Sequence, residues 1–181
     1  MRGYFGIGVE NVSKPMNVGN LVRSAHAFGA SFVFTVAAAF DPFGVDSNTS
    51  EAQGQVPFYR FGSIAELRLP EDCTLVGVEL DDRAVELPSF RHPRCAAYVL
   101  GQERGGLSAD MIGRCEFLVR IPTQFSLNLA TAGAIVMYDR LLAMRRFAAR
   151  PLMPGAPIEP PPAHEWGVPV WRRKPGTVKT G

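Results

Sequence analysis

Short apolar segments alternate with helical segments along most of this chain of 181 residues. The strand-like segments lie at 4–10, 31–36, 74–79, 96–100 and 117–121, and a shorter apolar piece at 56–59 follows a polar loop at 46–55. Strands that alternate with helices favour parallel pairing, because the helices provide the crossover connections. The sequence therefore predicts an α/β domain with a mostly parallel sheet flanked by helices.

The predicted helices have recognisable ends. Apolar residues from Val18 to Phe28 recur at helical spacing, with Asn17 as a candidate N-cap and Gly29 just past the end. A weak helix is expected at 64–68, a short one up to Arg114 with Ser108 as its cap, and a last helix from about Asn128 to about Arg150 with Ser126 as a candidate cap.

The last predicted helix is apolar on two sides. One stripe consists of Leu129, Ala132, Gly133 and Val136, and the other of Ala134, Met137, Tyr138, Leu141 and Leu142. A helix at a protein surface has one such stripe, so two stripes predict burial on both sides. We expect one side to face the sheet and the other, at Met137, to face the partner in a homodimer. The alternative is a central core helix in a monomer.

Composition argues against several classes of protein. The longest apolar stretch, Phe32–Phe40, has nine residues, whereas a membrane-spanning helix needs about twenty. The first residues contain no apolar signal-peptide core, which favours the cytoplasm. The three cysteines form no CxxC pair and there are only three histidines, so we expect reduced thiols and no metal site.

The surplus of positive charge lies at the end of the chain. The last 31 residues hold four of the 19 basic and two of the 17 acidic residues, so the first 150 hold 15 of each. A nearly neutral body fits either a small-molecule enzyme or an RNA enzyme with a local basic patch. The candidate RNA-binding residues are Arg145, Arg146, Arg172, Arg173 and Lys174.

The composition changes sharply after residue 150. Eight of the fifteen prolines and both tryptophans, Trp166 and Trp171, occur in this last part. We therefore divide the chain into a domain, 1–150, and a proline-rich tail, 151–181. We expect the tryptophans either to anchor the tail on protein or to stack on bases of RNA.

Three segments carry candidate chemistry. In the first, 17–23, Asn20 and Arg23 share the polar face of a helix. The second, 100–108, is a glycine-rich turn with Glu103 directly after a strand, where open α/β sheets bind ligands. The third, 121–128, opens the last helix, whose free backbone N–H groups can serve a polar ligand. A capped helix or a tight turn explains each segment when it is taken alone.

None of these segments is a known nucleotide fingerprint. The turn at 100–108 lacks the Gly-Lys-Ser/Thr of a Walker A loop. Gly6 and Gly8 lie inside the first predicted strand without a third glycine, so they are no dinucleotide motif either.

Together and in this order, the three segments resemble the three motifs of the SPOUT superfamily, specifically its SpoU/TrmH-like ribose 2′-O-methyltransferase branch. The resemblance covers residues 9–139 and is specific because three separate motifs agree. The matching positions are Glu10, Asn11, Pro15, Asn17, Gly19 and Arg23 in the first motif, Gly101, Glu103 and Gly105–Ser108 in the second, and Ile121, Pro122 and Ser126–Asn128 in the third.

The resemblance implies a fold and a cofactor. Members of this family thread a C-terminal trefoil knot, a rare exception to unknotted topology, and form homodimers. Their knotted loops bind S-adenosylmethionine largely through backbone groups. Carried onto this chain, the cofactor-binding residues are Val78, Glu79, Leu100, Gly101, Ile121, Leu127, Asn128 and Leu129.

The resemblance also implies the reaction, methylation of a ribose 2′-hydroxyl in tRNA or rRNA, with a slight preference for tRNA. The candidate catalytic residues are Arg23, Asn17, Glu103, Asn128 and Ser126. Arginine has a pKa above about 12 and is a poor base, so we assign Arg23 to the phosphate and to the charge that develops on the oxygen. Glu103 either holds Arg23 or accepts the proton.

Two other functions remain open at this point. One is a catalytically inactive SPOUT-fold protein that binds RNA, and the other is a relative that methylates a base. The chain also departs from its better-known relatives, because only residues 123–125 separate Ile121-Pro122 from Ser126. It shows no additional N-terminal RNA-binding domain, and the tail matches no feature of the family.

Overall fold

The structure, a computed structural model, describes residues 3–40, 56–102, 105–145, 147–148, 150–151 and 153–158. Contacts divide the chain into two compact units, residues 1–144 and 145–181. The helices and strands described below all belong to the first unit, and the described residues of the second carry neither helix nor strand.

A seven-stranded sheet forms the centre of the described part of the first unit, in the order β3-β2-β1-β6-β4-β7-β5. Its neighbouring strands all pair in parallel, which confirms the predicted α/β class. The strands are β1 (Tyr4–Glu10), β2 (Phe32–Val36), β3 (Phe58–Phe61), β4 (Thr74–Val78), β5 (Val85–Glu86), β6 (Cys95–Leu100) and β7 (Phe117–Arg120). β5 is absent from the sequence prediction, because two residues are too few to show a period, and β3 was expected only as a short apolar piece at 56–59.

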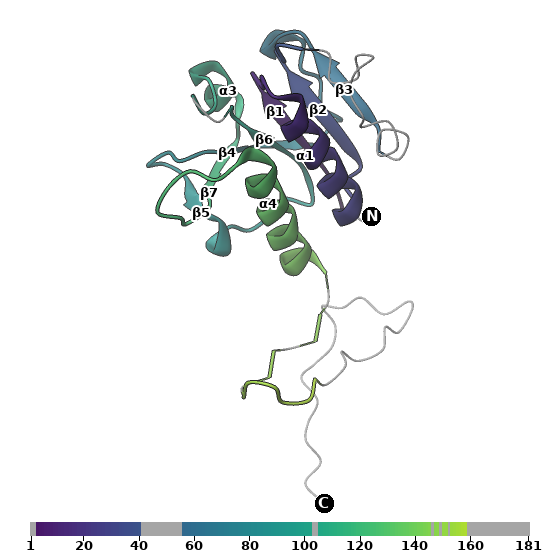
Figure 1. The fold of residues 1–181 in the computed structure, drawn as a ribbon, viewed down its shortest axis with the longest axis vertical. Helices are drawn as coiled ribbons and strands as arrows, with labels where there is room; N and C mark the ends of the chain where they lie inside the picture. The colour runs from purple at the N-terminus through teal and green to yellow at the C-terminus, as the bar shows by residue number, and fades with distance from the viewer. Residues whose placement is uncertain are drawn as a thin grey trace, which may run out of the picture. The chain divides into compact units, whose positions relative to one another are not determined.

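Helices cover both faces of the sheet. On one face, α1 (Pro15–Phe28) and α4 (Leu129–Met144) lie side by side (Figure 1) and bury their apolar residues against β1. The opposite face packs against α3 (Ala109–Arg114) and against the segment around the 3₁₀ turn η1 (Ile64–Glu66). A second 3₁₀ turn, η2, covers Leu87–Ser89. Among the described helices, none has the length and hydropathy needed to cross a membrane.

Two glycines of β1 serve packing. A Cβ atom on Gly6 would lie 2.2 Å from the ring of Phe32, and one on Gly8 would lie 2.5 Å from the ring of Phe34. Both distances are far below van der Waals contact. The missing side chains therefore make room for the aromatic rings of β2, in keeping with the absence of a dinucleotide motif here.

The structure confirms two predicted helix caps and corrects the start of α1. Ser108 accepts a hydrogen bond from the Met111 backbone N–H at 3.1 Å, and Gly29 ends α1 in the left-handed conformation with φ 76°. The N-cap position of α1 is Lys14, because Pro15 is pre-organised for the first helical position and starts the helix earlier than predicted. Asn17 consequently lies within the first turn.

Both predicted ends of α4 are corrected. Asn128, and not Ser126, is the cap, since the Asn128 Oδ1 atom accepts the backbone N–H groups of Ala130 at 2.9 Å and Thr131 at 3.4 Å. The helix ends at Met144 and does not continue to Arg150. The apolar stripes end at Leu142, so further turns would lack the packing that stabilises short helices.

The predicted partner-facing position, Met137, is wrong. Its side chain is 0% exposed and belongs to the core between α4 and the sheet. Met137 and Tyr138 are about 100° apart around a helix of 3.6 residues per turn. Residues of one predicted apolar stripe therefore lie partly in the core and partly at the surface. Tyr138 is 51% exposed, Leu142 is 36% exposed and Met144 is 43% exposed, and these residues contribute exposed apolar surface on α4.

A buried polar cluster ties α4 to the start of the sheet. Arg140, 4% exposed, donates to the hydroxyl of Tyr98 at 3.1 Å. The Tyr98 hydroxyl lies 2.6 Å from His92 Nδ1, and His92 Nε2 lies 2.8 Å from Asp139 Oδ2. These contacts are all satisfied when His92 is neutral and carries its proton on Nε2. His92 Nε2–H then donates to Asp139, and His92 Nδ1 accepts the Tyr98 hydroxyl. Arg140 also donates to the backbone carbonyl oxygens of Tyr4, Pro93 and Arg94.

We expect this cluster to make stability depend on pH. Burial lowers the pKa of His92 from 6.5, and the charge of Arg140 lowers it further, while the hydrogen bond and charge of Asp139 oppose the shift. Below pH 6.5 the unfolded chain therefore binds the proton more readily than the folded chain. The free energy of unfolding consequently decreases as the pH is lowered. Urea titrations of the wild type and His92→Gln between pH 8 and pH 5 test this. The stability advantage of the wild type should shrink as the pH falls through 6.5, whereas a constant advantage would contradict the assignment.

Candidate functional site

The three segments singled out in the sequence meet at the carboxyl ends of the parallel strands. β1, β4, β6 and β7 end at Glu10, Val78, Leu100 and Arg120, respectively. A cavity of about 130 Å³ opens there. It is lined by Val78, Glu79, Leu80, Leu100, Gly101, Gln102, Gly106, Ile121, Thr123, Ser126, Leu127, Leu129 and Ala132.

Seven of the eight residues predicted to bind the cofactor line this cavity. They are Val78, Glu79, Leu100, Gly101, Ile121, Leu127 and Leu129. The eighth, Asn128, does not line it and caps α4 instead. Residues far apart in the sequence are thus brought together by the sheet order, in which β6 and β7 are both neighbours of β4.

The cavity combines an apolar wall with a few polar groups. Leucine, isoleucine and valine side chains make up much of the wall, and the polar groups come from Glu79, Gln102, Thr123 and Ser126. Such a mixture suits a flat apolar ring attached to hydroxyl groups and a positive charge. Pockets for small ligands typically have volumes of about 300–1,000 Å³, so a ligand of the size of a nucleoside would extend beyond this cavity.

The glycine-rich turn after β6 folds back closely on itself. A Cβ atom on Gly101 would lie 2.0 Å from the carbonyl carbon of Gly106, and Gly106 has a φ of 65°. Both positions therefore require glycine. The Leu107 backbone N–H donates to Glu79 Oε2 at 2.6 Å, which fastens the turn to the end of β4.

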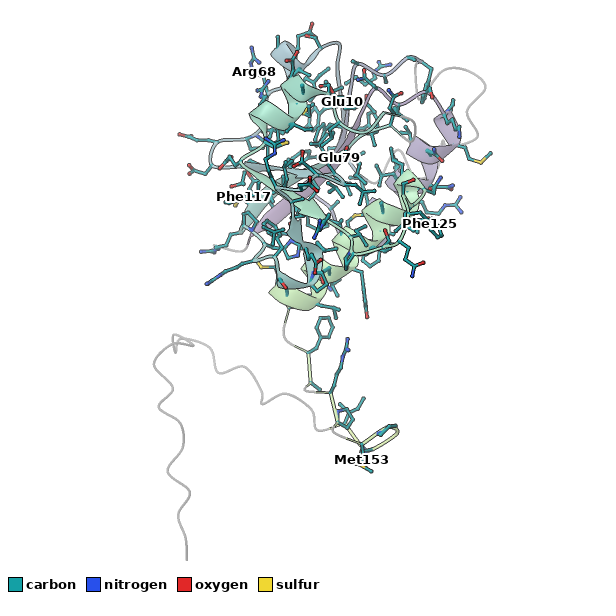
Figure 2. All side chains as sticks on the ribbon, turned by 90° about the vertical axis from the view of Figure 1, so that its left-hand side faces the viewer. Glu10, Arg68, Glu79, Phe117, Phe125 and Met153 are labelled. Atoms are coloured by element: carbon teal, nitrogen blue, oxygen red, sulfur yellow. The ribbon has the colours of Figure 1, made fainter. Side chains whose placement is uncertain are left out.

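A second carboxylate holds the same turn from the other side. Glu10, at the end of β1, is 1% exposed. Its Oε2 atom accepts the Ser108 backbone N–H at 2.8 Å, and its Oε1 atom accepts the Ser108 hydroxyl at 2.6 Å. Figure 2 labels Glu10 and Glu79, the two carboxylates whose contacts fall on adjacent residues of the turn.

The starts of α1 and α4 are joined by two of the predicted catalytic residues. Asn128 Nδ2 donates to Asn17 Oδ1 at 3.2 Å. Asn17 is 8% exposed, so this hydrogen bond links the first and third segments at the base of the site. Ser126 lies on the cavity wall two residues before Asn128.

Arg23 lies apart from the cavity. Its side chain is exposed on α1, and within the described residues its guanidinium makes no hydrogen bond or ion pair. Of the other predicted residues, Arg145 is exposed and belongs to the second unit. Glu103 of the catalytic set and four of the RNA-binding set, Arg146, Arg172, Arg173 and Lys174, lie outside the described residues.

The loop between β7 and α4 is short but internally bonded. The Thr123 hydroxyl donates to the carbonyl oxygen of Phe125 at 2.9 Å, and the Thr123 N–H donates to the carbonyl oxygen of Ile121 at 2.8 Å. Phe125 is 73% exposed and projects from this loop (Figure 2). This loop, which is shorter than in the better-known relatives, is therefore held by its own hydrogen bonds and carries an exposed aromatic ring.

Sequence reasoning missed several residues of the site. Leu80, Gln102, Gly106, Thr123 and Ala132 line the cavity without having been assigned to it. Glu10 was recognised as part of the first motif but received no role. A carboxylate at the end of an otherwise buried strand is the signal that marks it, because such a group needs hydrogen-bond donors. Across the described residues, no cluster of three or more His, Cys, Asp or Glu side chains could hold a metal ion.

Comparison with known proteins gives a consistent picture. The family model of the SpoU rRNA Methylase family matches residues 5–138. An uncharacterized tRNA/rRNA methyltransferase of Archaeoglobus fulgidus is 30% identical over 144 residues, which are 75% of this chain and 63% of that protein. The tRNA (guanosine(18)-2′-O)-methyltransferase of Escherichia coli K12 is 27% identical over 141 residues, which are 72% of this chain and 60% of that protein.

A solved structure shows the same similarity in three dimensions. The crystal structure of the SpoU methyltransferase AviRb from Streptomyces viridochromogenes, in complex with the cofactor AdoMet, has a TM-score of 0.67 at 26% identity. The match covers 78% of this chain and 58% of that chain. This chain thus spans about 60% of the length of these relatives.

Proposed function

We propose, because the chain belongs to the SpoU rRNA Methylase family, that it transfers a methyl group from S-adenosylmethionine to a ribose 2′-hydroxyl of tRNA or rRNA. The observation that carries the proposal is that the second and third motif segments line one cavity at the strand ends, while the Asn17–Asn128 hydrogen bond joins the first segment to the third. Relatives named as ribose 2′-O-methyltransferases and the AdoMet complex of AviRb support the reaction and the cofactor.

The cavity residues would hold the cofactor. Glu79 offers a carboxylate to hydroxyl or cationic groups, and the leucine and isoleucine side chains offer an apolar wall to a flat ring. Glycine at 101 and 106 lets the turn fold back closely enough to form part of the cavity wall. When bound, S-adenosylmethionine supplies an electrophilic methyl group.

The remaining motif residues would act on the RNA. Methyl transfer to a hydroxyl requires the oxygen to be aligned with the methyl group and its developing negative charge to be stabilised. Arg23 binds the phosphate backbone and stabilises that charge. Asn17 and Asn128, already hydrogen-bonded to each other, orient the ribose. Ser126 shapes the loop, and Glu103 holds Arg23 or accepts the proton.

We infer that the chain threads the trefoil knot of the SPOUT fold. In the sequence, the edge strand β5 lies between β4 and β6, yet β6 occupies the centre of the sheet between β1 and β4. β7 then returns to lie between β4 and β5. The later strands β6 and β7 are thus inserted between strands that precede them in the chain, an order that supports the knotted path.

The basic residues near the end of the chain would contact the RNA. The first 150 residues have no net charge, so the four basic residues of the last 31 supply the surplus. Arg172, Arg173 and Lys174 would bind phosphates, and Arg145 and Arg146 would extend the patch. A tRNA is the preferred substrate over rRNA. We propose a cytoplasmic location, as the sequence predicts.

We expect the protein to form a homodimer through α4. Tyr138 and Leu142 expose apolar surface on this helix, and the ring of Tyr138 packs at 6.3 Å from that of Phe28 on α1. Tyr138→Asp should convert the dimer into a folded monomer, because a carboxylate replaces apolar contact at the interface. Light scattering measures the mass, and Tyr59→Asp on β3, at a residue 52% exposed, is the matched control that should remain dimeric. A monomeric wild type would overturn this assignment.

Turnover of the cofactor on RNA tests the proposed function. Purified protein, bulk tRNA or rRNA and methyl-labelled S-adenosylmethionine should yield labelled RNA. A protein that binds RNA without catalysis would bind these molecules but transfer no label, and that result would reject the proposed activity.

A further inference from the structure

Glu10 is a buried carboxylate that the proposed methyl transfer does not use. It ends β1 and is 1% exposed. A charged group removed from water is unfavourable unless strong hydrogen bonds replace the lost hydration. Both of its oxygen atoms are used for this purpose, and both bind a single residue, Ser108.

Ser108 is held in one orientation by this pair of bonds. Its hydroxyl has only one proton, which it donates to Glu10 Oε1 at 2.6 Å. The Ser108 Oγ atom also accepts the Met111 backbone N–H at 3.1 Å and thereby caps α3. Glu10 thus determines which way the Ser108 hydroxyl faces and fixes the backbone where the turn enters α3.

The turn fixed in this way forms part of the cavity wall. Leu107, next to Ser108, donates its N–H to Glu79, and Gly101 lies against the backbone of Gly106. Gly101 and Gly106 both line the cavity. Since β6 lies between β1 and β4, carboxylates from the ends of both neighbouring strands hold the same turn.

We propose that Glu10 is a positioning residue for the cofactor cavity. Its carboxylate fixes Ser108, and through Ser108 the adjacent Leu107 and the wall formed by Gly101 and Gly106. Glu10 does not line the cavity, so it acts through Ser108 without touching substrate or cofactor. It also connects the first motif segment, which leads into α1, with the second. The inference rests on the proposed function, since it concerns the affinity for S-adenosylmethionine.

Two single substitutions break this link in different ways. Glu10→Gln keeps the shape but replaces one acceptor oxygen with an amide nitrogen that cannot accept, so one of the two donors of Ser108 loses its acceptor. Ser108→Ala removes the hydroxyl. Each should raise the Kd and the KM for S-adenosylmethionine about tenfold, as expected for the loss of a hydrogen bond to a charged group. The kcat at saturating cofactor should stay within about twofold, because no reacting atom is touched.

The variant that carries both substitutions tests whether Glu10 acts through Ser108. If Glu10 acts through Ser108, the double variant should bind the cofactor about as weakly as either single variant, and not about a hundredfold more weakly. Glu116→Gln is the matched control. Its carboxylate accepts the Leu75 N–H at 3.4 Å and does not line the cofactor cavity, so its cofactor affinity should equal that of the wild type.

Calorimetry with S-adenosylmethionine, at a temperature well below the unfolding midpoint of each variant, gives distinguishable outcomes. A wild type that does not bind the cofactor rejects the proposed function. A wild type that binds it, together with Glu10→Gln and Ser108→Ala variants of unchanged affinity, overturns the positioning role alone. A reduced kcat with unchanged KM also overturns it. If Glu10→Gln does not fold, Ser108→Ala decides by the same criteria.

Discussion

Arg23→Ala should reduce methyl transfer about 10²–10³-fold while the Kd for S-adenosylmethionine stays within a few-fold of the wild type. The magnitude is typical for removing one group that stabilises charge in a transition state. The rate should change without the cofactor affinity, because Arg23 is exposed on α1 and does not line the cavity. Single-turnover assays measure the transfer, and calorimetry measures the binding.

Two variants sharpen the Arg23 experiment. Arg23→Lys keeps the charge but loses the planar, two-pronged donor arrangement, so it should restore only part of the activity. Arg91→Ala removes another exposed arginine of the same unit and should leave the rate near that of the wild type. Loss of cofactor binding together with activity in Arg23→Ala would show that Arg23 supports the cavity, contrary to the role assigned here.

Arg140→Ala should destabilise the folded protein by about 3–5 kcal/mol, because several acceptors lose their donor and each buried group left unsatisfied costs about 1–3 kcal/mol. The guanidinium donates to three backbone carbonyl oxygens and to the hydroxyl of Tyr98. Truncation leaves these acceptors without their donor in a region that water does not reach, since Arg140 is 4% exposed. Equilibrium unfolding in urea measures the change.

Arg120→Ala is the matched control for Arg140. Arg120 pairs with Glu86 at 3.2 Å near the surface, where both side chains are substantially exposed. Such pairs contribute about 0–1 kcal/mol. Equal destabilisation by the two variants would show that the buried cluster does not anchor α4 to the start of the sheet.

The sequence predicted the elements better than their arrangement. β1, at Tyr4–Glu10, was placed correctly because its apolar run is bounded on both sides, and the cap of α3 was recognised from Ser108. The position of β6 between β1 and β4 depends on pairing between segments distant in the chain, and no local pattern encodes it. The same limit hid the role of Arg140, whose acceptor at Tyr4 is 136 residues away.

The candidate site shows the same division. Motif resemblance identified seven residues that the fold then gathered around one cavity, because the motifs lie at strand ends that the sheet brings together. It did not reveal that Glu10 and Glu79 hold the turn after β6 from two sides. Helical periodicity, for its part, placed Met137 at a partner interface, because periodicity alone does not distinguish a buried position from one that is only apolar.

Nucleoside analysis of methylated RNA is the most direct test of ribose 2′-O-methylation. RNA treated with the protein and labelled S-adenosylmethionine is digested to nucleosides, which are separated and identified by mass spectrometry. The label should be found in 2′-O-methylnucleosides, with the added mass on the ribose, and Arg23→Ala should produce none above background. Label on a base, or RNA without label although the wild type binds the cofactor, would contradict ribose 2′-O-methylation by this chain.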